Sequence, residues 1–547
     1  MNTVRSSCVL VLVAAVAAVG LRSVNLRNRP MHVDEAVHAD KFRDLLENGR
    51  YVYNRHEYHG PTLNFSTFVP ALLSGAGTYC QVTETTLRIV PVVFGGVLIL
   101  LLVGLRDGLG QWGAVFAGGF TLVSPIMSFY SRYYIMESLL VCFSLGLMVC
   151  GWRYAVRPRV IWAGGAGAFL GLMHATKETF VISVASMVIA WFLCRRSFPI
   201  HSPARPVMVW WKTTLHLLAA VLTAVAVSVL FFSSFGRNPQ GVADSILTYS
   251  DYFHRAGQNP THLHPWYAYL AWLGWYQFAD GPVFSEGVII ALAILAGIWI
   301  QFGKRPSQEG GGRFHRFLLY YTLILTILYS LIPYKTPWCA MGFFHGMILL
   351  AGVATSRLVL IPNRILGSAA ALIIGVGTAH LGWQNYLGNY CIVSDSRNPW
   401  VYAHTSGDIF EIEKTIREVA AVHPDGNQMY LQVICPGYDY WPLPWYLRDF
   451  PRVGYWSMVQ NEVVSAELIL AMPSLEEALM TRLFELPPPG QRHMYMPLFE
   501  RRMELRPSVE IRGYIRKDLW DRFRARQDPD PDAILQDSPS KPQPKPD

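Results

Sequence analysis

Residues 213–234 read TTLHLLAAVLTAVAVSVLFFSS, a run of 22 residues without an acidic or basic side chain other than one histidine. A helix needs about 20 mostly apolar residues to cross roughly 30 Å of hydrocarbon. Similar apolar runs recur along the chain and stop near His380. Only 15% of the 547 residues are charged, whereas soluble chains carry about 25%. The sequence therefore predicts a polytopic membrane protein.

Eleven apolar runs are long enough to be spans, and they predict a mainly α-helical transmembrane bundle over residues 1–381. The predicted spans are 7–22, 87–105, 112–129, 137–153, 160–174, 179–194, 213–234, 284–302, 314–332, 338–355 and 364–381. The stretch 62–79 differs, because Pro70, Gly75 and Gly77 interrupt its short apolar core. We interpret it as an interfacial or re-entrant helix that does not cross.

The charges between the spans indicate an orientation. With 62–79 not crossing, one face receives fifteen Lys and Arg residues against two acids, Asp107 and Glu309, while the other face carries thirteen of each. Because bases mark the cytoplasmic side, we expect a multi-pass protein of the cell (inner) membrane with a cytoplasmic N-terminus and an extracytoplasmic C-terminal domain. The first run could instead be a cleaved signal peptide, since Arg5 precedes it.

Beyond residue 381 the composition becomes that of a soluble domain. The pattern predicts a small α/β domain over 382–527, followed by a disordered tail at 528–547 that is rich in Pro, Asp and Lys. The expected elements are a helix at 408–422, strands at 429–434 and 466–473, and a helix at 474–484 that Ser474 and Glu477 open as a capping box. This region is net negative, with 18 bases and 23 acids, so the overall charge of +8 gives no sign of nucleic-acid binding.

The strongest local signal follows the first span and reads His32-Val33-Asp34-Glu35-Ala36-Val37-His38. Two adjacent carboxylates flanked by histidines near a membrane surface could act as a general base or hold a divalent cation. The alternative is a solvated loop or a helix cap. Asp34 and Glu35 are therefore candidate catalytic residues.

Two further outer junctions carry polar groups. Tyr58-His59-Gly60-Pro61-Thr62 predicts a fixed turn, or equally a helix N-terminus with Pro61 at its first position. At the junction of the third and fourth spans, Arg132 could bind a phosphate, and Glu137 could be a second acid at a site shared with Asp34. The alternative for these two is an Arg132–Glu137 ion pair.

Lys177 and Lys335 lie in short outward turns, where they do not serve the pattern of positive charge inside. They could be snorkelling anchors, or they could bind a lipid-linked phosphate together with an arginine.

The long outer loop 235–283 contains an HxH pair, His262 and His264, followed by a cluster of aromatic residues that begins with Trp266. An isolated HxH pair is a weak indication of a metal site. The aromatic cluster could form the belt of an interfacial helix or stack against a sugar.

This layout resembles the GT-C superfamily of membrane glycosyltransferases, which includes the dolichyl-phosphate-mannose protein mannosyltransferases and the bacterial aminoarabinose transferases. The ordered set DEAVHA, YHGPTLNF, SRYYIMES, HATKE, HPWYAYL, YKTPW and YWPLPWYLR is similar to the prokaryotic family of flippase-activity-associated, GT-C-like proteins. The resemblance is clearest over the first six spans.

The resemblance implies roles for individual residues. The first-loop acid of GT-C enzymes is the catalytic base or a metal ligand, a role that would fall on Asp34 with Glu35 beside it. The second-loop acid maps to Glu137, where many relatives have Asp. If a metal is present, Asp34 and Glu137 would hold it, as Mg²⁺ or Mn²⁺. The aminoarabinose transferases carry a Lys in the turn around His59, and its absence here leaves His59 itself, Lys177 or Lys335 to substitute for it.

The reaction implied by the resemblance is inverting transfer of a sugar from a polyprenyl-phosphate donor to a protein, lipid or glycan acceptor at the outer face. Two other classes stay open. The chain could be a non-catalytic accessory protein for flipping of lipid-linked sugars, as the family label suggests. It could also be a secondary transporter, although transporters place ionisable residues near the bilayer midplane, where this sequence has almost none.

Overall fold

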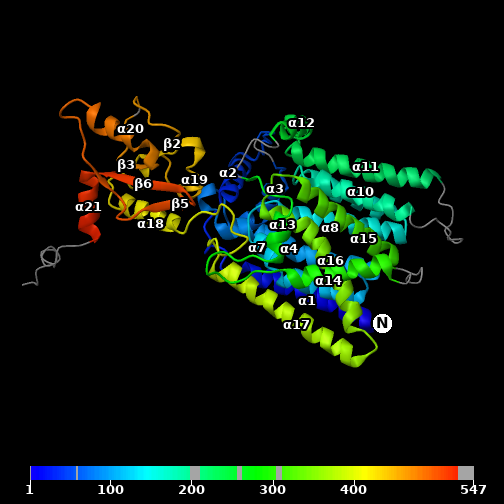
Figure 1. The fold of residues 1–547 in the computed structure, drawn as a ribbon. Coiled ribbons are helices and arrows are strands. Elements are labelled where there is room, and N and C mark those ends of the chain that lie inside the picture. The colour runs from blue at the N-terminus through cyan, green and yellow to red at the C-terminus, as the bar shows by residue number, and fades with distance from the viewer. Residues whose placement is uncertain are drawn as a thin grey trace, which may run out of the picture. The chain divides into compact units, whose positions relative to one another are not determined.

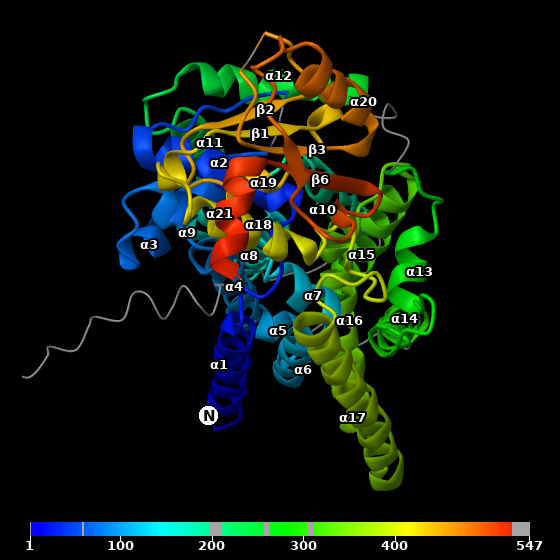
Figure 2. The ribbon, with the colours of Figure 1, turned by 90° about the vertical axis from the view of Figure 1, so that its left-hand side faces the viewer.

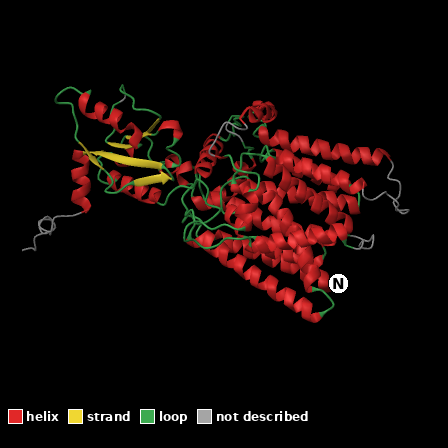
Figure 3. Ribbon diagram, in the orientation of Figure 1, coloured by secondary structure: helices red, strands yellow, loops and turns green. Residues whose placement is uncertain are grey.

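The computed structural model describes residues 2–56, 59–196, 210–255, 262–303, 311–462 and 464–527. The chain divides into two compact units. A helical unit comprises Met1–Arg29 and Val37–Tyr402, and a smaller C-terminal unit comprises Pro30–Ala36 and Ala403–Asp547. Among the described residues, every β-strand lies in the second unit (Figures 1 and 3).

The helical unit is a bundle of α-helices. Its α-helices are α1 (Asn2–Ser23), α2 (Val33–Asn48, whose first turn falls in the other unit), α3 (Thr62–Leu73), α4 (Glu84–Leu101), α5 (Arg106–Leu109), α6 (Gln111–Val123), α7 (Pro125–Tyr130), α8 (Glu137–Val156), α9 (Val160–His174), α10 (Phe180–Arg196), α11 (Trp210–Phe232), α12 (Gln240–Arg255), α13 (Ala268–Gly274), α14 (Gly287–Phe302), α15 (Gly312–Leu331), α16 (Met341–Val359) and α17 (Arg364–Tyr386).

Seven helical stretches in the described residues are long and apolar enough to cross a membrane, so the prediction of a multi-pass membrane protein is confirmed. They are Arg5–Ser23, Glu84–Leu109, Glu137–Val156, Lys212–Phe232, Gly312–Leu331, Pro337–Val359 and Arg364–Cys391. The other four predicted spans lie on shorter helices of 13 to 17 residues, which are α6, α9, α10 and α14. Helix α3 has 12 residues and is about 18 Å long, too short to cross.

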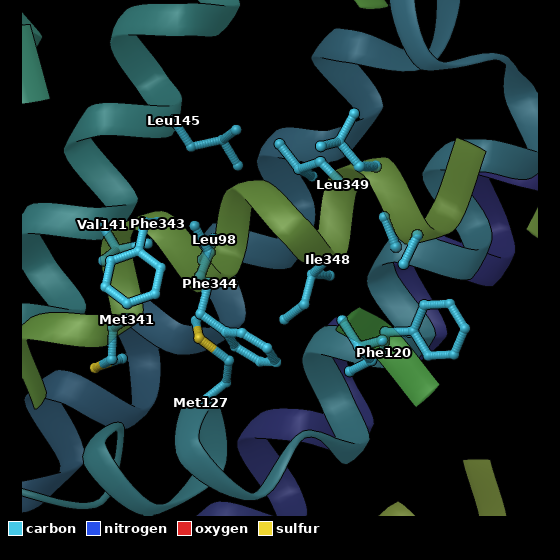
Figure 4. Packing of buried hydrophobic residues seen from close by; sticks show 14 of the residues in the cluster. Leu98, Phe120, Met127, Val141, Leu145, Met341, Phe343, Phe344, Ile348 and Leu349 are labelled. Carbon is cyan, nitrogen blue, oxygen red and sulfur yellow. The ribbon is translucent and has the colours of Figure 1, made fainter. Parts of the chain in front are cut away.

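The core of the helical unit lies between α4, α6, α8 and α16. Figure 4 shows Phe120, Met127, Leu145 and Phe344 within this core. Helices α6 and α16 approach so closely that a side chain at Gly352 would lie 2.4 Å from the Gly113 carbonyl oxygen. Glycine is therefore required at this contact.

The C-terminal unit is built on one sheet flanked by helices, which confirms the predicted α/β domain. Its strands are β1 (Leu431–Ile434), β2 (Val453–Trp456), β3 (Leu468–Ala471), β4 (Tyr495–Pro497), β5 (Met503–Arg506) and β6 (Val509–Arg516), and its α-helices are α18 (Asp408–Ala420), α19 (Leu443–Tyr446), α20 (Glu476–Met480) and α21 (Lys517–Gln527). The strand order is β2-β1-β3-β6-β4, with β5 paired to β6. Figure 2 labels β2, β1, β3 and β6 of this sheet. Strands β2, β1 and β3 are parallel, and β6 is antiparallel to its neighbours.

Three details differ from the sequence-based expectations or lie beyond them. The helical unit continues past the predicted boundary at 381, because α17 extends to Tyr386 and the buried Trp400 accepts a hydrogen bond from Tyr130 at its carbonyl, 2.9 Å away. Ser474 lies inside a 3-10 turn, Pro473–Leu475, and therefore does not cap α20. The predicted disordered tail, 528–547, lies outside the described residues.

Candidate functional site

Two of the outer turns predicted from the sequence pack directly on each other. The Gly60 amide donates to the Thr176 carbonyl at 3.0 Å, and the Thr62 amide donates to the Ala175 carbonyl at 3.1 Å. A side chain at Gly60 would lie 2.1 Å from the Ala175 oxygen, so only glycine allows this contact. The turn before α3 and the turn between α9 and α10 therefore form one rigid pair.

Glu178 connects the two turns to each other and to Tyr53. Its carboxylate accepts hydrogen bonds from the Tyr53 hydroxyl (3.1 Å), the His59 amide (3.0 Å) and the His59 ring at Nδ1 (3.1 Å). Burial alone would raise the pKa of Glu178, but the hydrogen bonds and charge of His59 outweigh it and lower that pKa to about 2. Glu178 is therefore an ionised carboxylate that holds His59 in its left-handed conformation, with φ of 71°.

Glu137 and Lys177 form a buried ion pair beside these turns. The Lys177 ammonium donates to the Glu137 carboxylate, and both side chains are nearly inaccessible to solvent. The position of Glu137 at the first residue of α8 suits a negative charge, because the helix dipole is positive there. The Arg132–Glu137 pair considered from the sequence does not form.

This pairing bears on the predicted metal. No three His, Cys, Asp or Glu side chains of the described ranges gather closely enough to hold a metal ion. The Lys177 ammonium already neutralises Glu137 and would repel a divalent cation next to it. The surroundings of Glu137 therefore do not fit a metal ligand.

Arg132 lies apart from Glu137, near the end of α1. Its guanidinium donates to the Val24 carbonyl at 2.9 Å and stacks over the Tyr390 ring at 4.5 Å, while Nη1 is buried without a hydrogen-bond partner. Arg29 and Arg88 line the same small cavity, which has a volume of about 10 Å³ and room for roughly one water. This cavity is an electropositive pocket too small for a phosphate as it stands.

Buried arginines at this end of the bundle were not foreseen from the sequence. Arg22 and Arg88 are almost fully buried and donate to main-chain carbonyls of Thr121 and Leu26, at 2.6 Å each. The sequence did contain one indication of a buried arginine, because Arg88 follows the first turn of an otherwise apolar span. An ionisable residue in such a place indicates a polar cavity or a functional role.

The HxH loop and the Lys335 turn form a short antiparallel ribbon. Leu263 pairs with Tyr334, the Lys335 amide donates to the His262 carbonyl at 2.9 Å, and the His264 amide donates to the Pro333 carbonyl at 3.0 Å. Two motifs separated by 70 residues of sequence are therefore neighbours.

Lys335 is a buried cation in this ribbon. Its ammonium donates to the carbonyls of Ile332 and His264 and lies 5.9 Å from the centre of the Tyr269 ring. Within the described part of the chain, no carboxylate lies within ion-pair distance of Lys335. Burial lowers the pKa of Lys335 below its usual value. An anion placed here would restore the charge balance.

The two histidines of the ribbon are both within hydrogen-bond distance of one tyrosine. His262 Nδ1 and His264 Nε2 lie 2.8 Å and 3.1 Å from the Tyr402 hydroxyl oxygen. Trp266 is 63% exposed, and its ring packs edge to face on the Tyr267 ring, with ring centres 5.7 Å apart. Trp266 is thus open to a ligand or to lipid.

Cys339 connects the Lys335 ribbon to the Glu137–Lys177 pair. The Thr336 hydroxyl lies 3.3 Å from Cys339 Sγ, and the charges of both Lys177 and Glu137 act on this thiol. The ribbon and the ion pair therefore lie at the same end of the bundle.

The two adjacent acids in the first turn of α2, Asp34 and Glu35, have different surroundings. The His32 amide donates to Glu35 at 3.1 Å and the Asp34 amide donates to His32 Nδ1 at 3.1 Å, which is a reciprocal helix cap of the capping-box type. Glu35 is fully buried, whereas the Asp34 side chain is 43% exposed. Because Nδ1 of His32 accepts a hydrogen bond, it carries no proton to share with Asp34. Glu35 thus fits the helix-cap interpretation, and Asp34 is the carboxylate that is accessible.

Helix α2 carries both Asp34 and His38. Asp34 and His38 are four residues apart on α2 and so share a face of that helix. The His38 ring lies 5.8 Å from the His59 ring, next to Glu178.

Residues 67–232 match the dolichyl-phosphate-mannose-protein mannosyltransferase family. The structure of ArnT from Cupriavidus metallidurans bound to undecaprenyl phosphate is similar over 92% of this chain and 97% of that chain, with a TM-score of 0.62 and 14% sequence identity. The fold is GT-C-like, as the sequence predicts. The same ArnT in the apo state has a TM-score of 0.60, with the same identity and coverage.

A more distant similarity is to the Archaeoglobus fulgidus oligosaccharyltransferase, with a TM-score of 0.48 and 14% identity over 82% of this chain and 63% of that chain. A search of curated proteins finds no match to the chain.

Proposed function

We propose that this chain is an inverting glycosyltransferase of the cell (inner) membrane, which moves a sugar from a polyprenyl-phosphate donor to an acceptor at the extracytoplasmic face. The observation that carries the proposal is Lys335, a buried cation without a carboxylate partner in the described ranges, at the same end of the bundle as the Glu137–Lys177 pair. A buried ammonium of this kind is stabilised by an anion. The ArnT structure similar in fold carries undecaprenyl phosphate, a lipid phosphate of the proposed class.

Asp34 is assigned as the general base, because its carboxylate is accessible while Glu35 is used as a helix cap. Asp34 takes the proton of the acceptor hydroxyl as the acceptor oxygen bonds to C1 of the sugar. The bond between C1 and the phosphate oxygen breaks on the opposite side, and the electron pair leaves with the polyprenyl phosphate. Lys335 stabilises the negative charge that develops on this phosphate.

The other residues of the site have supporting roles in this scheme. Lys177 holds Glu137 charged and fixed, and Glu178 fixes His59. Arg132, with its unpaired Nη1, offers a second cation for the lipid phosphate once its small cavity opens. Trp266 beside Tyr267, and the His262–His264 pair beside Tyr402, offer rings on which a sugar can stack. No metal is assigned, since the surroundings of Glu137 do not fit one.

The test is incubation of the purified full-length protein with radiolabelled polyprenyl-phosphate sugars, followed by tracing of the label. The label is expected to move from the carrier to an acceptor in the wild type and to stay on the carrier in Asp34→Asn. Asp44→Asn is the matched control, because Asp44 is an exposed acid on the same helix. If the label crosses the bilayer still attached to its carrier, and Asp34→Asn has no effect, the accessory role in flipping replaces the enzymatic one.

A further inference from the structure

A second cavity lies at the opposite end of the helical unit. It has a volume of about 280 Å³, and its lining includes Trp299 of α14, His315 and Arg316 of α15, and Arg357 of α16. Glu137 begins α8 and Lys335 precedes α16, whereas Arg357 is near the end of α16. The cavity is therefore remote from the proposed site.

The cavity is basic and incompletely satisfied. Arg357 is exposed, and within the described ranges no carboxylate lies within ion-pair distance of it. His315 Nε2 is buried and has no hydrogen-bond partner there. An accessible guanidinium without a carboxylate partner can pair with a phosphate group. The side chains thus favour a bound anion with oxygen acceptors.

The surface beside the cavity indicates what carries that anion. Ile294, Ile298 and Phe302 are spaced by four residues on α14, so they share one face, and all three are exposed. This apolar stripe ends at the cavity, where Trp299 of the same helix forms part of the lining. Trp is enriched where a chain passes between hydrocarbon and water. A free inorganic ion would need no such stripe.

We infer that this cavity binds the headgroup of an anionic phospholipid, with the phosphate between Arg316 and Arg357 and an acyl chain along Ile294, Ile298 and Phe302. A volume of about 280 Å³ is just below the range of about 300 to 1,000 Å³ for ligand pockets, which suits a headgroup and excludes a whole lipid. Basic pockets between transmembrane helices bind acidic headgroups in this way. The inference does not depend on the proposed transfer reaction.

Lipid retention by the purified full-length protein tests the inference. In native mass spectrometry and thermal unfolding, phosphatidylglycerol is expected to bind and stabilise, whereas phosphatidylcholine and inorganic phosphate do not. Arg357→Gln is expected to weaken phosphatidylglycerol binding about fivefold, and the double variant Arg316→Gln/Arg357→Gln about 25-fold. Arg364→Gln, an exposed arginine at the start of α17, is the matched control and retains wild-type binding.

Three results would overturn the inference. The first is equal phosphatidylglycerol binding by the wild type and the double variant. The second is equal protection by inorganic phosphate, which would make the cavity a site for free anions. Arg357→Lys keeps the charge and is expected to keep most of the binding, so it separates loss of the site from loss of the fold. The third is a glutamine variant that has the thermal stability of the wild type and still prefers phosphatidylglycerol.

Discussion

The Met31 amide donates a hydrogen bond to the Tyr446 hydroxyl, with 2.8 Å between nitrogen and oxygen. The Met31 carbonyl accepts a second one from the Thr405 hydroxyl at 2.6 Å, and the rings of His32 and His404 lie 5.0 Å apart. The segment that leads into Asp34 is thus fastened to the C-terminal unit. Tyr446 belongs to the YWPLPWYLR motif, and its hydrogen bond to Met31 fixes the segment just before Asp34, the proposed base.

We predict that Tyr446→Phe slows sugar transfer without weakening donor binding. The variant keeps the ring and removes one hydrogen bond, worth about 1 kcal/mol, so kcat is expected to fall about fivefold while the donor KM stays constant. Thr405→Val is expected to behave alike. Tyr438→Phe, at an exposed tyrosine of the same unit, is the control. Equal kcat in Tyr446→Phe and wild type would remove the positioning role.

The length and apolarity of the spans made the helical unit predictable, because the hydrocarbon thickness dictates both. Which turn packs on which is a tertiary property that periodicity does not encode. Arg132 and Glu137 are five residues apart in the sequence, which suggested an ion pair. In the structure, Glu137 pairs instead with Lys177, 40 residues away. The HxH pattern likewise gave no indication of Tyr402, 138 residues beyond His264.

The Glu137–Lys177 pair is expected to show strong coupling in stability. Lys177→Met or Glu137→Gln alone leaves a buried charge or polar group without its partner, and Lys177→Met is expected to lower the free energy of unfolding by about 3 to 5 kcal/mol. The double variant is expected to lose less than Lys177→Met. Thermal or chemical unfolding in detergent measures both.

The exposed pair Asp107–Arg153 provides the comparison for this cycle. Solvent screens it, and Arg153→Gln is expected to change the free energy of unfolding by less than about 1 kcal/mol. If the losses of the two single variants simply add in the Glu137–Lys177 double variant, the pair is not coupled.

Chelation provides a separate prediction. Because the Lys177 ammonium already neutralises Glu137, transfer is expected to continue at an unchanged rate after removal of divalent cations with EDTA. The measurement is the label-transfer assay with and without chelator, followed by addition of Mg²⁺ or Mn²⁺. A rate that collapses in EDTA and recovers with one of these ions would restore the metal ligand role of Asp34 and Glu137.

Lys335 is expected to govern affinity for the donor phosphate. A hydrogen bond to a charged group contributes about 1.5 to 3 kcal/mol, so Lys335→Gln is expected to raise the donor KM about tenfold to a hundredfold. Lys335→Arg keeps a cation and is expected to lose less. Arg397→Gln, at an exposed arginine paired with Asp395, is the control. A donor KM that is the same in Lys335→Gln and wild type would place the phosphate elsewhere.

The lowered pKa of Glu178 predicts how the stability of the protein depends on pH. Its pKa in the folded protein is about 2, below the value of about 4.3 expected for an unfolded glutamate. The unfolded state therefore takes up the proton first as the pH falls. The stabilisation by Glu178 is fully present above about pH 4.5 and is lost progressively as the pH falls toward 2, by an amount on the order of 3 kcal/mol. Thermal unfolding of wild type and Glu178→Gln in detergent, from pH 7 to pH 2.5, measures this loss. The stability difference between the two proteins is expected to shrink across this range, and a difference that stays constant would show that the Glu178 carboxylate is not held ionised by His59.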